Sequence, residues 1–426
     1  MSAAASPDRA VVVGSGLAGL RGAEAMRRAG FTGSLTLVGA EAHRPYDRPP
    51  LSKHVLTGAV AADATTLPSL VPLEAEWRLG TAATGLDRKN ARVHLADGSS
   101  LPYDRLLIAT GTRARAWPNP HEGRLAGVHT LRSREDAAAL RGALAAGQRR
   151  VLVIGGGFIG CEMASACAAL GIPVTLVEPS ATPLARVLGT HLGDVIGAMH
   201  AARGVEMRCG TEVEWLEDDG RGRVVRAHLA GGGHVETDLV VVALGAVRNT
   251  EWLADSGLGA DAGGLDCDAD GHALDSEGRA DTRIAAAGDV ARFPHPLYDG
   301  RRVALEHWGH AVAQAEHAGR LLAGRRPDRP YAAVPTFWST QHGINIKSVG
   351  LTEGADGFVI AQGSPKEGRF LAVYGRAGRC IAALSIDCAR WLPAYAAQVA
   401  ARAPFPPIRG ATDQPADLAV LPPGFP

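Results

Sequence analysis

Apolar and polar positions along the first forty residues follow the pattern of a β-α-β unit. An apolar run at 10–13 predicts a buried strand, the segment 17–29 has the spacing of a helix, and the run at 35–38 predicts a second strand. The turn between the first strand and the helix reads Gly14-Ser15-Gly16-Leu17-Ala18-Gly19. This is the G-x-G-x-x-G arrangement that opens dinucleotide-binding units.

The same pattern returns in the middle of the chain. A strand at 151–154 leads into Gly155-Gly156-Gly157-Phe158-Ile159-Gly160, a helix ends near Leu170, and another strand covers 174–177. In such units the glycines allow a tight turn and a close approach of the backbone to a pyrophosphate, which lies at the N-terminus of the helix. The chain is therefore predicted to bind two dinucleotides, one held and one exchanged.

The remaining pattern predicts further strands and a different C-terminal part. A strand at 103–110 ends in Ala109-Thr110-Gly111, one at 238–244 ends before Gly245, and one at 283–287 is followed by Gly288-Asp289. A helix over about 303–322 then gives way to short β-like runs at 346–350, 358–361, 370–374 and 380–386. The fold class is therefore α/β, with two Rossmann-like dinucleotide-binding domains and a C-terminal α+β interface domain. The length of 426 residues allows this, since domains average roughly 150 residues.

Composition and charge exclude several classes of partner. The 46% hydrophobic and 21% charged residues are typical of a soluble globular protein, and no apolar run approaches the roughly 20 residues of a membrane span. The 44 basic residues balance the 44 acidic ones, so neither nucleic acid nor a membrane surface is expected as a partner. The short polar segment 1–9 shows no secretory signal, so a cytoplasmic location is expected.

The cysteines predict neither a metal site nor a disulfide scaffold. They form no C-x-x-C pair and have no histidine at ligand spacing. The first 160 residues contain none, and the six are Cys161, Cys167, Cys209, Cys267, Cys380 and Cys388.

An acid near the end of each second strand is the candidate ribose ligand. Glu178 follows the strand at 174–177, where a carboxylate accepts hydrogen bonds from ribose hydroxyls and repels a 2′-phosphate. No arginine follows before Arg186, so NADH is predicted in preference to NADPH. In the first unit the candidate is Glu41, because Ala40 stands directly after Gly39. Either acid could instead be a solvated strand end.

Several further motifs resemble those of the FAD-dependent ferredoxin, putidaredoxin and rubredoxin reductases, which have a glutathione reductase-like fold without a redox disulfide. These motifs are Arg44-Pro45-Tyr46-Asp47-Arg48-Pro49-Pro50-Leu51-Ser52-Lys53, Ala109-Thr110-Gly111, Gly288-Asp289, Glu306-His307-Trp308 and Phe337-Trp338-Ser339. The resemblance covers about residues 10–390. With it we predict a split FAD-binding domain at 1–115 and 245–325, an NAD-binding domain at 116–244, a C-terminal domain at 326–403 and a proline-rich tail at 404–426.

The resemblance also implies the residues that bind each nucleotide. Asp289 would hold the ribityl chain and Trp308 would lie at the pyrimidine edge of the flavin. The FAD-binding residues would be Gly14, Ser15, Gly16, Leu17, Ala18, Gly19, Glu41, Arg48, Lys53, Ala83, Thr110, Gly111, Arg132, Gly288, Asp289 and Trp308. The NAD-binding residues would be Gly155, Gly157, Phe158, Ile159, Gly160, Glu178, Arg186 and Gly245. Phe158 could cover the nicotinamide pocket or simply pack at the start of its helix.

Lys53 and Glu162 are the candidate catalytic residues. Lys53 lies in a proline-flanked turn, and Glu162 lies just inside the helix that follows the NAD glycines. Resemblance to the wider disulfide reductase fold implies that they form an ion pair near flavin N5, where the pair would orient the nicotinamide. The alternative is an ordinary surface pair, which contributes about 0 to 1 kcal/mol to stability.

The cysteine positions and the resemblance together predict a ferredoxin reductase. Thiol-relay relatives need a cysteine soon after the first β-α-β unit, and this chain has none before Cys161. Electrons would pass from NADH to FAD and then singly to an iron-sulfur ferredoxin, which would supply a monooxygenase. Two alternatives stay open: a monodehydroascorbate or quinone reductase, and an NADH-sensing flavoprotein that resembles apoptosis-inducing factor.

Two features could contact the ferredoxin. Trp338 could lie beside the flavin where the carrier docks, or it could be a core tryptophan. A basic patch for an acidic ferredoxin, or else a solvated face, could be formed by Arg301, Arg302, Arg325 and Arg326.

Overall fold

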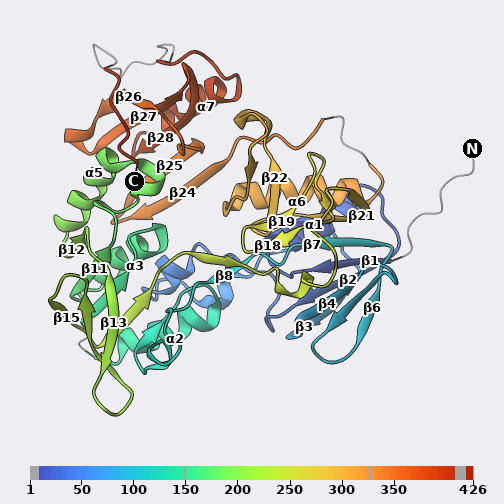
Figure 1. Ribbon diagram of the computed structural model, residues 1–426, viewed down its shortest axis with the longest axis horizontal. Coiled ribbons are helices and arrows are strands. Elements are labelled where there is room, and N and C mark those ends of the chain that lie inside the picture. The colour runs from blue at the N-terminus through green and yellow to red at the C-terminus, as the bar shows by residue number, and fades with distance from the viewer. Residues whose placement is uncertain (1–8, 148–149, 326–328, 408–418, 426) are drawn as a thin grey trace, which may run out of the picture. The chain divides into compact units, whose positions relative to one another are not determined.

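The computed structural model describes residues 9–147, 150–325, 329–407 and 419–425 (Figure 1). The chain divides into two compact units. Unit 1 comprises Met1–Asp47, Thr66–Arg113 and Val247–Pro335, and unit 2 comprises Arg48–Thr65, Ala114–Ala246 and Thr336–Pro426. The segment Arg48–Thr65 thus belongs to the same unit as the second glycine motif, whereas we expected it in the FAD-binding domain. The predicted domain boundaries themselves stay a prediction.

A six-stranded sheet forms the core of unit 1. Its order is β20 (His272–Leu274), β21 (Ala280–Ala286), β7 (Arg105–Ile108), β1 (Arg9–Val13), β2 (Ser34–Gly39) and β3 (Glu76–Leu79). All neighbours pair in parallel except β20 with β21. Four of the five residues of β1 are buried, as expected for a central parallel strand with an apolar run.

Two helices pack against each other beside this sheet. They are α1 (Leu17–Arg28) and α6 (Trp308–Leu322). Their close approach requires glycine, because a Cβ on Gly319 would lie 2.3 Å from the carbonyl oxygen of Gly22. The helix predicted over 303–322 begins only at Trp308, since Arg302–Val303 form strand β23 instead.

Two smaller sheets complete unit 1. One is an antiparallel meander of β4 (Ala83–Asp87), β5 (Arg92–Leu95) and β6 (Ser100–Pro102). The other has the order β18 (Ala260–Asp261), β19 (Gly264–Asp266), β22 (Ala291–Pro294) and β23 (Arg302–Val303). Strands β8 (Thr112–Ala114) and β17 (Ala246–Arg248) lie at boundaries of the two units.

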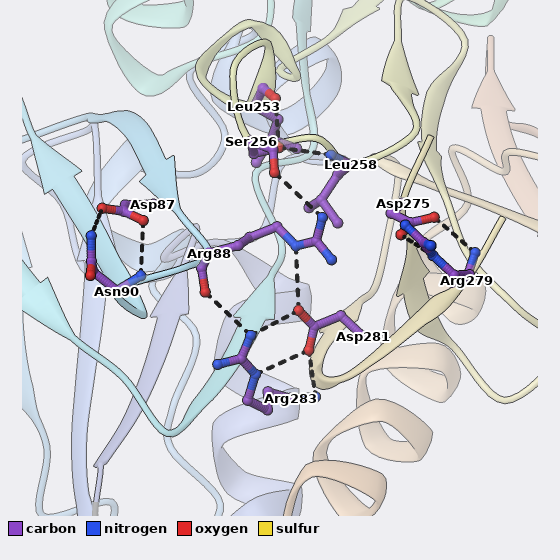
Figure 2. Close-up of polar contacts among 10 residues, drawn as sticks. All are labelled: Asp87, Arg88, Asn90, Leu253, Ser256, Leu258, Asp275, Arg279, Asp281 and Arg283. Atoms are coloured by element: carbon purple, nitrogen blue, oxygen red, sulfur yellow. Dashed lines mark hydrogen bonds and ion pairs between the residues drawn. The ribbon is translucent and has the colours of Figure 1, made fainter. Parts of the chain in front are cut away.

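Asp281 on β21 holds the meander in place. Its carboxylate accepts hydrogen bonds from Arg88 Nε at 3.3 Å and from an Arg283 terminal nitrogen at 3.1 Å, as Figure 2 shows. Arg283 also donates to the carbonyl oxygen of Arg88 at 3.3 Å. Burial acts to raise the pKa of Asp281, but hydrogen bonds from Arg283 outweigh it and the pKa is lowered. The network therefore holds Asp281 ionised.

Unit 2 contains the second dinucleotide-binding sheet. Its five parallel strands have the order β12 (Val205–Cys209), β11 (Val174–Glu178), β10 (Val151–Ile154), β16 (Leu239–Val242) and β9 (Val128–His129). The helices of this part are α2 (Arg134–Ala145), α3 (Phe158–Ala169), α4 (Ala185–Leu188) and α5 (Thr190–Ala201). A three-stranded antiparallel sheet contains β13 (Val213–Asp218), β14 (Val224–Leu229) and β15 (His234–Glu236).

The C-terminal part of unit 2 is an antiparallel sheet with one helix. The strand order is β24 (Thr336–Gln341), β25 (Ile344–Gly350), β28 (Arg379–Ile386), β27 (Arg369–Arg376) and β26 (Gly357–Ser364), and α7 covers Leu392–Ala400. The four predicted β-like runs are therefore confirmed, while β24 was not predicted. In the proline-rich tail, Pro404 forms an isolated β-bridge with Arg379, and Leu421 forms one with Phe358. Residues 408–418 of the tail lie outside the described part.

The predicted α/β fold with two β-α-β units and a C-terminal α+β part is confirmed. Over the described ranges, no helix combines the length and the apolar character that a bilayer crossing requires.

Candidate functional site

The first glycine turn can be formed only by glycine. Gly14 has φ +113°, and a Cβ there would lie 2.1 Å from the carbonyl oxygen of Ala109 at the end of β7. A Cβ on Gly19 would lie 1.8 Å from the carbonyl oxygen of Gly14, so α1 could not approach β1 so closely. At Gly16, by contrast, no described atom lies within 4 Å of an added Cβ. That side of the turn is open to a ligand.

The second glycine turn repeats this geometry in unit 2. Gly155 has φ +106°, and a Cβ there would lie 2.5 Å from the carbonyl oxygen of Ala243 after β16. A Cβ on Gly160 would lie 1.9 Å from the carbonyl oxygen of Gly155. Gly157 again has open space around a Cβ among the described atoms. Both turns therefore have the shape that close approach of a pyrophosphate requires.

The helices that follow these turns leave their first N–H groups without a side-chain acceptor. Within the described residues, neither α1 nor α3 has a side-chain N-cap or an acid in its first turn. In contrast, α2 begins with a complete capping box of Ser133 and Asp136. An uncapped helix N-terminus favours a bound anion, so both glycine units fit a phosphate.

Glu178 lies directly against the second glycine turn. Its Oε2 accepts the Gly156 N–H at 2.6 Å, and its Oε1 accepts the Ser180 N–H at 2.8 Å. The carboxylate is thus fixed at the end of β11, next to the open side of the turn. Arg186 is exposed on α4, and the loop before it is tied to the turn because the Leu184 N–H donates to the Gly156 carbonyl oxygen at 2.9 Å.

Glu41 has a different local environment. Its Oε2 accepts a hydrogen bond from the Tyr46 hydroxyl at 2.5 Å. The strand before it ends at Gly39, where an added Cβ would lie 1.9 Å from the Ser15 hydroxyl oxygen, so Ser15 fills the space between turn and strand. Ala83 begins β4 shortly after Thr81, whose N–H donates to the Gly39 carbonyl oxygen at 3.0 Å.

The other FAD-binding candidates of unit 1 have specific polar partners. The Asp289 carboxylate accepts from the Thr112 hydroxyl at 3.1 Å, and the Trp308 indole N–H donates to Asp47 at 2.8 Å. The Gly288 N–H donates to the buried Gln314 side chain at 2.9 Å.

Thr110 and Gly111 are joined to Asn249, which forms two hydrogen bonds with Thr110 at 2.8 and 2.9 Å and one with the Gly111 carbonyl oxygen at 3.0 Å. In unit 2, Arg48 donates to the Arg132 carbonyl oxygen at 2.8 Å, and the Gly245 carbonyl oxygen accepts from the Arg115 N–H at 2.9 Å. Among the FAD-binding candidates, Thr110 and Gly111 therefore share the partner Asn249 within unit 1, and Arg48 contacts Arg132 within unit 2.

Lys53 and Glu162 form the implied ion pair, with Lys53 Nζ 2.6 Å from Glu162 Oε2. Lys53 lies on a π-helical turn over Leu51–Val55, a rare conformation that is frequent at functional sites. The side chains are 16% and 5% exposed, so the alternative of an ordinary surface pair is wrong. The position of this pair beside a flavin stays a prediction.

Two hydroxyl groups complete the environment of the Glu162 carboxylate. Ser52 donates to Oε2 at 2.5 Å and Ser339 donates to Oε1 at 2.6 Å. Each oxygen of this buried carboxylate therefore has a hydrogen-bond donor, as a buried charge requires. Ser339 lies on β24, which packs on α3, so the C-terminal sheet contributes directly to the site.

Further polar side chains continue from Ser339. Gln341 donates to the Ser339 hydroxyl oxygen at 3.2 Å, His200 Nε2 lies 3.0 Å from Gln341 Oε1, and His342 Nε2 lies 2.9 Å from His200 Nδ1. Burial lowers the pKa of His200. Burial, then the neighbouring His200 and Arg203, lower the pKa of His342 to about 4. Both imidazoles are therefore neutral at pH 7.

The two aromatic candidates of unit 2 face different surroundings. Phe158 packs on Phe337 with ring centroids 4.5 Å apart, which agrees with packing at the start of α3. Its role as a cover for nicotinamide stays a prediction. Trp338 alternates with Phe337 and Ser339 along β24 and is 42% exposed, so the alternative of a core tryptophan is wrong. Docking of a ferredoxin on it stays a prediction.

Two arginines of the candidate basic patch have local partners. Arg302 pairs with Asp266 at 2.8 Å, and Arg325 donates to the Ala29 carbonyl oxygen at 3.3 Å. Arg301 is half-buried, and Arg326 lies outside the described residues.

The sequence did not assign roles to Ser52, Ser339, Gln341, His200 or His342. Ser52 and Ser339 belong to the motifs on which the family resemblance rests, and their place next to Lys53 and Trp338 was the available signal. The other three carry no such signal, because only the fold brings His200 on α5 next to Gln341 and His342.

Comparison with known proteins agrees with this geometry. The family model for pyridine nucleotide-disulphide oxidoreductases matches residues 8–315, and a model for a reductase C-terminal domain matches residues 336–421. The chain is 38% identical over 386 residues to the probable ferredoxin reductase CtmF of Castellaniella defragrans, which covers 89% of this chain and 90% of that one. It is 37% identical to the anthranilate 1,2-dioxygenase system ferredoxin–NAD(+) reductase component of Burkholderia cepacia, with 93% and 95% covered.

Among solved structures, the covalent putidaredoxin reductase–putidaredoxin complex matches with a TM-score of 0.86 and 32% identity, covering 93% of this chain and 94% of that one. The two family models also divide the chain between β23 and β24, where the C-terminal sheet begins. The chain therefore belongs to the pyridine nucleotide-disulphide oxidoreductase family, among its ferredoxin reductases.

Proposed function

We propose that the protein is an FAD-dependent ferredoxin reductase that oxidises NADH and delivers single electrons to an iron-sulfur ferredoxin of an oxygenase system. The observation that carries the proposal is the ion pair of half-buried Lys53 with buried Glu162, on the unit that also holds the second glycine turn. Relatives support the acceptor and the donor, since the names of two of them state ferredoxin reduction and one states NAD(+). A monooxygenase as the final oxygenase is the narrower prediction.

The residues present fit two dinucleotides. Both glycine turns are open where a pyrophosphate would lie, and both helices present N–H groups without a side-chain cap among the described residues. Bound FAD supplies the ring that accepts hydride, a chemistry that no side chain provides. In unit 1, Asp289 would bind the ribityl hydroxyls and Trp308 would flank the ring.

Lys53 and Glu162 would act on charge and orientation. A buried ammonium stabilises negative charge that develops close to it, and its effect is larger in a water-poor site than in solution. Glu162 holds that ammonium in one place, because its carboxylate accepts from Lys53 at 2.6 Å and from two serine hydroxyls. Glu178 would bind the adenosine ribose of NADH and repel a 2′-phosphate.

The cysteines favour an external electron acceptor over a thiol relay. In the described residues the cysteines are free thiols, and all are buried except Cys209. Burial, with a smaller contribution from Glu162, raises the pKa of Cys161 far above its usual range, so this thiol is protonated at neutral pH. A thiol that stays protonated and buried is a poor electron relay.

The test is NADH-dependent reduction of cytochrome c by the purified holoenzyme, with and without an added ferredoxin from the same genome. We expect fast reduction only with ferredoxin. Because of Glu178, the rate with NADPH should be lower than the rate with NADH by about 10-fold or more. Equal rates with small quinones in place of ferredoxin would support the quinone reductase alternative instead.

A long-lived charge-transfer band after NADH addition, with dimerisation and slow turnover, would support the NADH-sensing alternative. A cytoplasmic location remains a prediction, which fractionation of the source cells would test.

A further inference from the structure

A chain of hydrogen-bonded side chains leads from Glu162 to a half-buried histidine at the end of a hairpin. Its members are Glu162 on α3, Ser339 and Gln341 on β24, His200 on α5, and His342 in the turn after β24. All belong to unit 2. Ser339, Gln341 and His200 are at most 1% exposed, so water cannot substitute for these partners.

The hydrogens of this chain can be arranged in one way only. An ionised carboxylate only accepts hydrogen bonds, so the Ser339 hydroxyl must donate its single hydrogen to Glu162. The Ser339 oxygen then accepts from the Gln341 amide nitrogen, which turns the amide oxygen toward His200. His200 Nε2 must therefore carry a hydrogen.

A neutral imidazole carries its hydrogen on one nitrogen, which leaves His200 Nδ1 as an acceptor. His342 must then donate from its Nε2. Every donor in the chain thus points toward the Glu162 carboxylate, and the dipoles add in the direction that stabilises its negative charge.

The backbone supports the same contact at the outer end. His342 and Gly343 have φ of +51° and +78° and form the two-residue turn between β24 and β25. Such turns favour Asn or Gly, so a histidine in this conformation is unusual. Its N–H donates to Ser165 on α3 at 2.7 Å, and its ring donates to His200. The turn is therefore anchored on both helices that adjoin the chain.

We propose that Ser339, Gln341, His200 and His342 are positioning residues, which hold the Glu162 carboxylate and through it the Lys53 ammonium in the geometry for hydride transfer. This proposal rests on the proposed function for the role of Lys53 at the flavin. The chain itself is a property of unit 2 and can be tested separately.

The first test is the tautomer of His200, measured by NMR of ¹⁵N-histidine-labelled holoenzyme without NADH and assigned with His200→Gln. We expect a neutral ring with its hydrogen on Nε2 in the wild type and loss of this preference in Gln341→Met. A hydrogen on Nδ1 in the wild type, or a doubly protonated ring at neutral pH, would overturn the proposal. Because NADH is absent, this result does not depend on the proposed function.

The second test is the rate constant for flavin reduction by NADH in stopped flow, with the NADH dissociation constant measured separately. Ser339→Ala should lower the rate constant on the order of 10-fold without changing the dissociation constant, because it removes a hydrogen bond to a charged group. Ser339→Thr, which keeps a hydroxyl, should restore the rate to within about 2-fold. Gln341→Met should have an intermediate effect.

The matched control is Thr340→Val, whose side chain lies on the opposite face of β24. It should leave the rate constant unchanged. A wild-type rate in Ser339→Ala, or an equal loss in Thr340→Val, would contradict the positioning role. If NADH fails to reduce the wild-type flavin at all, the proposed function is wrong, while the tautomer measurement still decides whether the chain exists.

Discussion

The two helices that follow the glycine turns each bury a glutamate, and the two glutamates have different partners. Glu24 on α1 is paired with Arg21 on the same helix, both of its oxygens lying 2.9 Å from one arginine nitrogen. It also accepts the Leu70 N–H at 2.8 Å. Glu162 on α3 is paired with Lys53 from a distant π-helical turn and with Ser339 from the C-terminal sheet.

This difference separates a structural pair from a candidate functional pair, although both glutamates lie on the helix that follows a glycine turn. The Glu24 partners are neighbours along α1 and the segment beside it, so this pair is closed and fixes α1 in place. The Glu162 partners come from two segments of unit 2 far from α3 in the sequence, the turn over Leu51–Val55 and β24, which meet α3 only in the folded protein. A carboxylate held from several directions is suited to position a charge, because its hydrogen-bond partners together fix its orientation.

The largest effect expected from this comparison is on stability. Glu24→Gln leaves the 7% exposed Arg21 without its carboxylate, so the free energy of unfolding should fall by about 3 to 5 kcal/mol. Urea unfolding of the holoenzyme measures this loss. The double variant Arg21→Met with Glu24→Gln should recover most of it. Flavin reduction by NADH should keep its wild-type rate constant, and a slower rate would show that Glu24 acts on function as well.

Lys53→Met should act on the rate of flavin reduction. Removal of the ammonium should lower the rate constant of flavin reduction by about 100-fold, since a misplaced or missing positioning charge costs on this scale. Stopped-flow absorbance at the flavin band measures it. Lys89→Met, at an exposed lysine of unit 1, is the control and should behave as wild type. An unchanged rate in Lys53→Met would reduce the Glu162 site to a structural pair like that of Glu24.

Both units contain a buried histidine, His310 in unit 1 and His200 in unit 2, and burial lowers the pKa of each. His310 in unit 1 is 3% exposed, and burial, then the neighbouring His307, lowers its pKa to about 3. A folded-state pKa below the unfolded value of about 6.5 means that the stabilising contribution is complete above pH 6.5 and is lost as the pH falls toward 3. Below pH 6.5 the free energy of unfolding falls by about 1.4 kcal/mol per pH unit, so the loss at pH 5 is about 2 kcal/mol.

His310→Asn removes this proton-binding site. Between pH 7 and pH 5 the variant should therefore lose about 2 kcal/mol less unfolding free energy than the wild type. Urea unfolding at the two pH values measures the difference. Equal losses in both proteins would show that another buried group, such as His307, dominates acid sensitivity.

The sequence predicted the elements that depend on local pattern. Both glycine turns, their flanking strands and the helices after them were predicted within a few residues, because apolar periodicity and glycine position determine them. Strand β24 was missed, since its buried positions include Ser339 and Gln341 and so give no apolar alternation. The reason these polar side chains are buried is their contact with Glu162 and His200, which lie far away in the sequence.

The smallest effect expected concerns the ribose acids, where the two units also differ. Glu178 accepts two backbone N–H groups at the glycine turn, while Glu41 accepts the Tyr46 hydroxyl. Glu178→Ala should lower the preference for NADH over NADPH by about 10-fold, because both the ribose hydrogen bonds and the repulsion of a 2′-phosphate disappear. Equilibrium titration of the two nucleotides measures the preference.

Glu178→Gln separates the two causes, since the amide can still accept hydrogen bonds but carries no charge. If repulsion dominates, Glu178→Gln should bind NADPH as well as Glu178→Ala does and keep more of its NADH affinity. If the hydrogen bonds dominate, Glu178→Gln should resemble the wild type for both nucleotides. Glu41→Gln in unit 1 should change neither affinity. A change in this variant would mean that unit 1 also contributes to the choice between NADH and NADPH.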